Sequence, residues 1–393
     1  MFKRTILFLS LLIAFTAGVT RSQSSSQNQR TTKTRTSTHI SQDDQDNRMR
    51  WQFSDDDLKQ TVEIRGRAEF TDDYKDIRDV SDGGYVKIEE ERDRVSRRYE
   101  VRRDRGDQLN RFYYLNGKAQ TIDDDARAWI ARIVLHAVRQ GGIDAEKRVQ
   151  TMLRQSGVNG VLAEIDQIQG DYAKRLYFEA LVKFGNLNTA TLQDVLHKMA
   201  AQISSDYEQA QLLIGVAPTL VGKEPAVPAF FEAVATIKSD YERGRVLKTV
   251  LQKNPASHTL LLHVANSTTS IKSDYEKSGV LKEVAAMYLD DASLRGVFFQ
   301  SIDSIHSDYE RRGALTALIK NRNLNAEVLN RMLDSAANIQ SDYEKASFLL
   351  EVSSNYAGDT RLKEAFLKVV ETIKSDYERG RVLSALLRNK QIG

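Results

Sequence analysis

The fold is decided by the segment TIKSDYERGRVL, which occupies Thr236–Leu247 and recurs letter for letter at Thr372–Leu383. From residue 158 onward an Asp-Tyr pair occurs seven times; the first two pairs are 35 residues apart and the later ones follow at steps of 34. The pairs are Asp171 and Tyr172, Asp206 and Tyr207, Asp240 and Tyr241, Asp274 and Tyr275, Asp308 and Tyr309, Asp342 and Tyr343, and Asp376 and Tyr377. A fixed period of this length indicates a solenoid of stacked supersecondary units.

Each unit predicts two helices joined by a tight turn. An Ile stands four residues before every Tyr, and apolar residues return six and nine residues after it, which is helical spacing. Six units carry Ser-Asp-Tyr-Glu, a capping box in which the Ser side chain caps the helix and the Glu carboxylate reaches back to the Ser N–H. Gly170 and Ala173 replace Ser and Glu in the first unit, as expected of a terminal repeat. We therefore predict helix-turn-helix units of the HEAT or TPR kind.

The Asp-Tyr pairs allow two interpretations. Seven phenols and seven carboxylates could line a binding groove, or the Asp residues could lie at helix N-termini while the Tyr rings pack between units. We favour the structural interpretation and expect mostly buried rings, because a ladder built for packing is regular. Function then depends on residues that vary between units, such as Phe230, Phe298, Arg245 and Arg312.

Residues 1–22 predict a secretory signal peptide, with Lys3 and Arg4 before an apolar core and Thr16-Ala17-Gly18 as the cleavage site. The alternative is an uncleaved anchor, although the apolar run is shorter than the roughly 20 residues that span a bilayer. The sequence has no cysteine, which excludes disulfides and a lipidated N-terminal Cys. We expect a periplasmic or secreted bacterial protein without an integral membrane span after cleavage.

The rest of the chain divides by composition and periodicity. Residues 23–48, rich in Ser, Gln and Thr, predict a disordered linker. Residues 49–121 alternate between turn signals such as Asn116-Gly117, which is typical of a small antiparallel sheet of about five strands. Residues 122–157 predict a helical connector and residues 158–393 the solenoid, so the fold class is α+β.

Two charged features of these regions have alternative interpretations. Alternating Arg and Glu on the strands could bind a polyanion, but acids and bases nearly cancel, so we interpret them as a solvated face that protects the sheet. Asp123, Asp124 and Asp125 could form a metal site, but no His or Glu is spaced to complete it. We therefore interpret the three Asp residues as the N-terminal cap of a helix.

The sequence shows no catalytic constellation. Its six His are scattered, His258 and His263 are five residues apart, and no phosphate loop or nucleophile elbow is present. A net charge of +3 provides no bulk attraction to nucleic acid. We predict no enzyme, cofactor, metal or nucleic-acid partner; the disfavoured alternative is an enzyme acting on wall polymers, which would need a carboxylate pair in a cleft.

Three segments before the repeats carry a family resemblance: GYVKIEE at Gly84–Glu90, YLNG at Tyr114–Gly117 and DARAWI at Asp125–Ile130. Together with the Ile-x-Ser-Asp-Tyr-Glu repeats, they resemble the extracytoplasmic C-terminal region of bacterial antirepressor-type, beta-lactam-sensor-like membrane metallopeptidases, over roughly residues 60–393. The sequence departs from that family in lacking its transmembrane helices and zinc-binding His-Glu-x-x-His. The resemblance therefore implies an exported sensing or interaction module without the peptidase or its zinc.

The leading functional hypothesis is a non-enzymatic exported scaffold. It would bind a protein or peptide partner on the solenoid surface, with the sheet domain as a second contact. The alternative is a module that senses envelope stress or cell-wall fragments beside a membrane metallopeptidase or another signalling partner. The oligomeric state is left open by the sequence.

Overall fold

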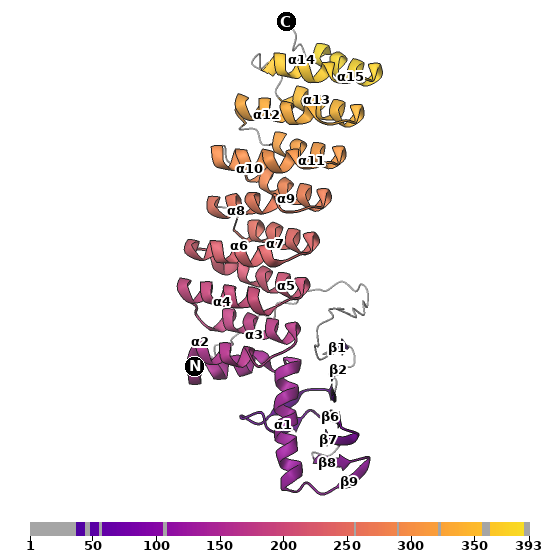
Figure 1. The fold of residues 1–393 in the computed structure, drawn as a ribbon, viewed down its shortest axis with the longest axis vertical. Helices are drawn as coiled ribbons and strands as arrows, with labels where there is room; N and C mark the ends of the chain where they lie inside the picture. Colours follow the sequence, from indigo (N-terminus) through magenta and orange to yellow (C-terminus); the bar gives the residue numbers. More distant parts are fainter. Residues whose placement is uncertain are drawn as a thin grey trace, which may run out of the picture. The chain divides into compact units, whose positions relative to one another are not determined.

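A computed structural model describes residues 37–43 as backbone and residues 48–54, 57–104, 108–254, 257–288, 291–320, 324–355 and 362–388 in full, apart from the side chain of residue 355. An antiparallel sheet is followed by a run of helices, which confirms the predicted α+β class (Figure 1). The chain divides into two compact parts between Val134 and Leu135, which we call the sheet part and the helical part. The predicted signal peptide and the linker up to residue 36 lie outside the described residues. None of the described helices combines the length and apolar character needed to cross a bilayer.

The sheet part contains a seven-stranded and a two-stranded antiparallel sheet. The large sheet has the strand order β1-β2-β3-β6-β7-β8-β9. Its strands are β1 (Ser37–Asp43), β2 (Arg48–Ser54), β3 (Leu58–Arg65), β6 (Tyr85–Arg92), β7 (Val95–Arg103), β8 (Leu109–Leu115) and β9 (Lys118–Gln120). The small sheet pairs β4 (Ala68–Phe70) with β5 (Ile77–Val80). The five predicted alternating segments correspond to β2, β3, β6, β7 and β8.

The prediction of a disordered linker is wrong for residues 37–43, which form β1. All seven residues pair with β2, from Ser37 opposite Ser54 to Asp43 opposite Arg48. A polar composition does not prevent this pairing, because an edge strand is held chiefly by main-chain hydrogen bonds to its neighbour. The sequence also gives no glycine signal for the turn from β6 to β7, where Asp93 and Arg94 take φ angles of 51° and 65°.

The first half of α1 (Asp124–Gly141) packs on one face of the large sheet. Asp123 accepts a hydrogen bond from the Ala126 N–H at 2.9 Å, which confirms the predicted helix cap. Trp129 lies against Tyr113 of β8, with ring centroids 5.6 Å apart. In β8 Tyr113 is buried, whereas its neighbours Phe112 and Tyr114 are half-buried.

Glu90 of β6 connects this helix to the sheet. Its carboxylate is 4% exposed and accepts hydrogen bonds from Trp129 Nε1 at 2.8 Å and from Arg132 Nη2 at 2.7 Å. Burial alone would raise the pKa of Glu90, but the hydrogen bonds from Arg132 and Trp129 hold that pKa below its usual value. The buried charge is thus paired, as such a site requires.

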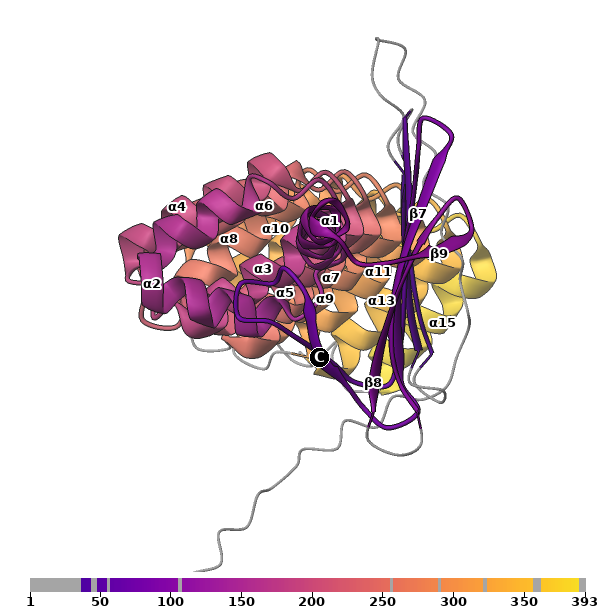
Figure 2. The same cartoon turned by 90° about the horizontal axis from the view of Figure 1, so that it is seen from below.

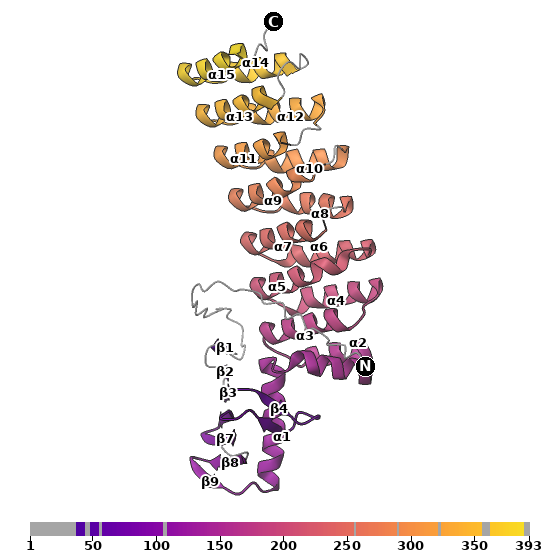
Figure 3. The same ribbon diagram turned by 180° about the vertical axis from the view of Figure 1, so that it is seen from behind.

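The helical part, from Leu135 onward, is a two-layered stack of helices. One layer contains α2 (Ala145–Ile165), α4 (Thr189–Gln202), α6 (Val227–Thr236), α8 (His258–Thr268), α10 (Ala292–Asp303), α12 (Ala326–Ala337) and α14 (Lys363–Glu371). The other contains α3 (Asp171–Phe184), α5 (Asp206–Val216), α7 (Asp240–Lys253), α9 (Asp274–Ala286), α11 (Asp308–Ile319), α13 (Asp342–Asn355) and α15 (Asp376–Arg388). Figures 2 and 3 show the even-numbered and odd-numbered helices on opposite sides of the stack. Every odd-numbered helix of this layer begins at the Asp of an Asp-Tyr pair, as the period predicts.

Two departures from a uniform helix pair have local causes. Gly157 interrupts α2 with φ 65° and ψ −164°, a conformation that favours glycine. Between α5 and α6 the chain forms two 3₁₀ turns, Ala217–Leu220 and Glu224–Ala226, each with a proline near its start.

The predicted capping box is half right. In six units the Ser Oγ accepts a hydrogen bond from the Glu N–H three residues on, at 3.3–3.4 Å, for example Ser239 and Glu242. The predicted reciprocal bond from the Ser N–H to the Glu carboxylate is wrong, because that N–H donates instead to the Asp of the preceding unit. The Glu carboxylates turn toward basic side chains, as in the pair of Glu208 with Arg175 at 2.5 Å.

The Asp carboxylate joins each unit to the next, and we call this contact the Asp clamp. It accepts hydrogen bonds from the N–H groups of the next unit's capping Ser and the residue before it, at 2.7–3.2 Å, at all six junctions between units. Asp240, for instance, binds the N–H groups of Lys272 and Ser273 at 2.9 and 2.8 Å. At Asp342 partial burial would raise the pKa, yet the two backbone donors lower it.

A second contact between units uses the residue two positions after each Tyr. It is a long polar side chain, and Lys277 and Lys345 at this position are each 4% exposed. Lys277 Nζ reaches Ser304 Oγ at the end of α10 at 2.5 Å, and Lys345 Nζ reaches Thr372 Oγ1 at the end of α14 at 2.8 Å. Lys174 does the same at the end of α4, with Gln202 O at 3.0 Å. A cation at a helix C-terminus is favourable, because the helix dipole is negative there.

The apolar core runs through the whole stack. The Ile four residues before each Tyr is at most 3% exposed in every unit. The two identical segments show what stacking contributes: Leu247 in the third unit is 0% exposed, whereas Leu383, its equivalent in the seventh, is 37% exposed. Burial at this position therefore depends on the neighbouring unit, as nearest-neighbour stacking requires.

We predict that Glu90 makes the stability of the sheet part sensitive to acid. Because its folded-state pKa lies below the unfolded value of about 4.3, its contribution is complete above that pH and is lost as the pH falls through the folded pKa. Glu90→Gln should cost about 1.5–3 kcal/mol at pH 7 and flatten the acid loss. Tryptophan fluorescence measures this selectively, since Trp51 and Trp129 are the chain's two tryptophans. An unchanged acid profile in the variant would contradict the assignment.

We also predict that Asp240→Ala destabilises the stack more than Asp376→Ala. Both Asp residues sit in the same twelve-residue sequence, but within the described residues only Asp240 clamps a following turn, while Asp376 is exposed and pairs with Arg379. We expect a loss of about 1.5–3 kcal/mol for Asp240 and at most about 1 kcal/mol, through the helix dipole, for Asp376. Urea unfolding and hydrogen exchange at the Lys272 and Ser273 amides measure the difference. Equal costs, or unchanged exchange at those amides, would show that the clamp does not join the units.

Candidate functional site

Six repeat tyrosines are exposed, against the expectation that their rings pack between units. The exposed fractions are 46% for Tyr207, 58% for Tyr241, 70% for Tyr275, 60% for Tyr309, 58% for Tyr343 and 74% for Tyr377. We call these six residues the tyrosine row. The prediction of buried rings is therefore wrong for every unit but the first, where Tyr172 is half-buried.

Helix geometry explains why these rings face solvent. The buried residues of α7 include Val246, Leu247 and Val250, which follow Tyr241 by five, six and nine positions. At about 100° per residue, these positions lie roughly 140–240° around the helix from the Tyr. The ring of Tyr241 therefore projects from the face opposite the core, and the same spacing applies to the other five exposed tyrosines.

The Asp clamp sets the spacing of the tyrosine row. Each clamp ties the N-terminus of one odd-numbered helix to the turn that starts the next, so consecutive Tyr residues lie on neighbouring helices. Helices in contact are about 8–10 Å apart. The row is thus a line of aromatic rings at a nearly constant interval along one edge of the stack.

Arginine side chains accompany several of these rings. The guanidinium carbon of Arg245 lies 5.9 Å from the centre of the Tyr241 ring, that of Arg312 lies 5.4 Å from Tyr309, and that of Arg381 lies 6.0 Å from Tyr377. These are cation–π distances. Arg245 also pairs with Glu242 at 2.6 Å, and Arg312 pairs with Glu344. Of the variable residues expected to carry function, these two arginines therefore border the row.

The other two variable residues proposed from the sequence belong to the core. Phe230 and Phe298 are 0% exposed, and each packs against the phenylalanine that follows it. Their apolar character is explained by packing alone. No ligand can reach them without opening the stack.

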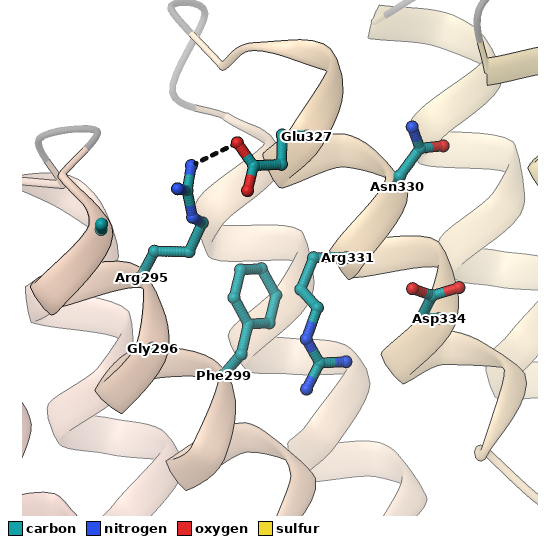
Figure 4. A pocket seen from close by; sticks show the side chains of 8 residues that line it. Arg295, Gly296, Phe299, Glu327, Asn330, Arg331 and Asp334 are labelled. Carbon is teal, nitrogen blue, oxygen red and sulfur yellow. Dashed lines mark ion pairs between the residues drawn. The ribbon is translucent and has the colours of Figure 1, made fainter.

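A shallow depression on the other layer is a second candidate site. It has a volume of about 510 Å³ and is lined by residues of α10 and α12, among them Arg295, Phe299, Glu327 and Arg331 (Figure 4). Both of its arginines are already in ion pairs, since Arg295 pairs with Glu327 at 3.1 Å and Arg331 pairs with Asp303. The other units do not have this set of residues at the equivalent positions. The depression therefore belongs to one junction.

The outward face of the sheet is also matched in charge. Arg50 of β2 pairs with Glu63 at 3.4 Å, Glu63 with Lys87 at 3.8 Å, and Lys87 with Glu89 at 3.3 Å. This chain of ion pairs supports the interpretation of a solvated face. Within the described ranges, no group of three or more His, Asp or Glu side chains is placed to hold a metal ion.

We predict that the tyrosine row contributes little to stability. Tyr275→Ala should change the free energy of unfolding by no more than about 0.5 kcal/mol, because the ring is exposed. The matched control is Tyr177→Ala in α3, whose ring is 0% exposed, and which should cost about 3–5 kcal/mol. Urea unfolding followed by circular dichroism gives both values. A cost for Tyr275→Ala near that of Tyr177→Ala would mean that the ring has a structural role after all.

Comparisons of the chain with models of protein families, with curated proteins and with solved structures find no match. The resemblance to the C-terminal region of sensor metallopeptidases therefore stays a prediction. The function of this α+β protein with its helical repeats has to be argued from its own surfaces, of which the tyrosine row is the most regular.

Proposed function

We propose that this protein is a non-enzymatic, exported interaction scaffold that binds a linear polypeptide along the tyrosine row. The observation that carries the proposal is the exposure of an aromatic ring at the same place in six successive units. Of the ten large apolar or aromatic side chains that are exposed in the described residues, six belong to this row. Clustered exposed aromatics are typical of binding surfaces.

Folding alone does not account for these tyrosines. The Ser caps the helix, the Asp clamps the next unit, and the Glu pairs with a base, whereas the Tyr ring beside them stays 46–74% exposed in six units. Exposed positions without such a role do vary between units. Three residues before the Tyr stand Lys238, His306 and Gln340, all exposed, in three of the units. A Tyr is nevertheless present at its own position in all seven.

The geometry of the row favours an extended partner. A row of rings along stacked helices offers an open edge rather than an enclosed pocket, and extended ligands are the ones that can contact many units together. Each ring supplies a small contribution, and the contributions add along the chain of one ligand. The sensing role implied by the family resemblance would use the same surface, with a fragment of an envelope polymer in place of the polypeptide.

Site-specific photo-crosslinking tests this proposal. A benzophenone amino acid is placed at position 241, 275 or 309, one at a time, in the cells that produce the protein, and the adducts are separated by size. We expect the same protease-sensitive adduct from all three positions, since one polypeptide follows the row.

The control position is 300, where the exposed Gln300 lies on α10 in the other layer. The triple variant Tyr207→Ala, Tyr343→Ala, Tyr377→Ala, with the crosslinker at position 275, should reduce the adduct. An adduct of equal yield from position 300, no adduct from any row position, or an adduct that resists proteases would overturn the proposal of a polypeptide partner.

A further inference from the structure

We infer that the polypeptide bound by the tyrosine row is a proline-rich segment in the polyproline II conformation. This inference rests on the proposed function and names the class of its partner. It comes from three properties of the row: the hydrogen-bonding groups that it leaves open, the interval between its rings, and the charge beside them.

The phenol hydroxyls of the row can donate hydrogen bonds to a ligand, and the carboxylate acceptors beside them are already engaged. Each clamping Asp accepts two backbone N–H groups, and each capping Ser accepts one, as at Asp240 and Ser273. The Glu carboxylates are 7–9% exposed in four units and pair with bases such as Lys248. What remains open to a ligand is the phenol hydroxyls, together with the ammonium groups of Lys238 and Lys272, which are exposed.

A proline-rich chain fits such a surface better than other extended peptides do. Proline has a carbonyl acceptor but no N–H donor, and a polyproline II helix has no internal hydrogen bonds, so its carbonyls point outward unpaired. A β-strand ligand would need donors and acceptors in alternation on its partner. Pyrrolidine rings pack against aromatic rings in the known recognition of such segments.

The interval expected for the row, from the general spacing of packed helices, matches the pitch of this conformation. Polyproline II has three residues per turn and a rise of about 3.1 Å, so that one face returns about every 9.3 Å. Neighbouring helices lie about 8–10 Å apart. One turn of the ligand therefore advances it by one unit of the stack, and successive prolines of one face meet successive tyrosines.

Charge makes the preference more specific. The residue three positions before the Tyr is an exposed lysine in three units, Lys238, Lys272 and Lys374. We therefore expect acidic residues between the prolines of the ligand to strengthen binding, and salt to weaken that part of it.

Fluorescence anisotropy with synthetic peptides tests the inference on the full chain. The probes are proline-rich peptides with interspersed Glu, of about 6, 15 and 24 residues, and Gly-Ser peptides with the same Glu content. The six rings span five steps, roughly 45 Å, which equals about 15 residues of polyproline II. Affinity should rise to that length and then level off. The Gly-Ser peptides should bind at least about tenfold more weakly.

Two variants test whether the row itself is the site. Tyr241→Ala, Tyr275→Ala and Tyr309→Ala together should weaken the 15-residue peptide at least about tenfold, as the loss of aromatic anchors does. Gln300→Ala, Glu327→Ala and Asp334→Ala, three exposed residues of α10 and α12, should leave its affinity unchanged. Equal binding of Gly-Ser and proline-rich peptides, affinity independent of length, or equal loss in both variants would overturn the inference.

The outcome also separates this inference from the proposed function. If crosslinks form along the row but the proline-rich peptide does not compete with them, the inference is wrong and the scaffold function stands. If neither crosslinks nor peptide binding is found, both are wrong. Competition by the proline-rich peptide and not by the Gly-Ser peptide would support both.

Discussion

The hydrogen bonds from one unit's Asp carboxylate to the next unit's turn are the interaction on which the stack depends. They satisfy two N–H groups that have no partner inside their own helix, and they use a charge that also favours the helix N-terminus on which it stands. Because the bond joins equivalent points of adjacent units, it fixes the distance between every feature that the units share. The connection from α5 to α6 contains two 3₁₀ turns, yet the next turn is clamped in the same way.

Each position of the repeated motif thereby has a separate task. The Ser caps the helix, and the Asp accepts hydrogen bonds from the turn of the next unit. The Glu and the residue after it form polar contacts at the junctions between units. The Tyr takes part in none of these contacts. Arg243 illustrates how fully the neighbouring positions are engaged, since its guanidinium binds Ile237 O in its own turn and Ser270 O beyond α8. The motif that makes the fold regular consequently also displays a regular row of rings.

The sequence predicts much of this fold and misassigns its most visible residue. A fixed period locates the start of every odd-numbered helix from α3 onward, and the Ser-Asp turn marks it again from α5 onward, because capping chemistry is local. The partner of Glu208 could not be predicted from the sequence. A Glu at this position is equally compatible with a capping box and with an ion pair to Arg175 of the preceding unit. The exposure of Tyr241, by contrast, follows from spacings already visible in the sequence: core residues six and nine positions later place the ring on the far side of the helix. The strand β1 was missed because edge pairing leaves little trace in composition.

A stack of this kind ties recognition to the number of units. Stability and binding are both sums over neighbours, so a ligand that repeats at the interval of the units gains affinity with each unit it covers and needs no strong contact at any one of them. The identical segments at Thr236–Leu247 and Thr372–Leu383 show that a unit's sequence does not alone decide its environment, since Leu383 is partly exposed where Leu247 is not. The tyrosines differ in this respect. Tyr241 and Tyr377 are both exposed, because their side of the helix faces away from the neighbouring units, and a row that stays open in six successive units is the property that a long ligand requires.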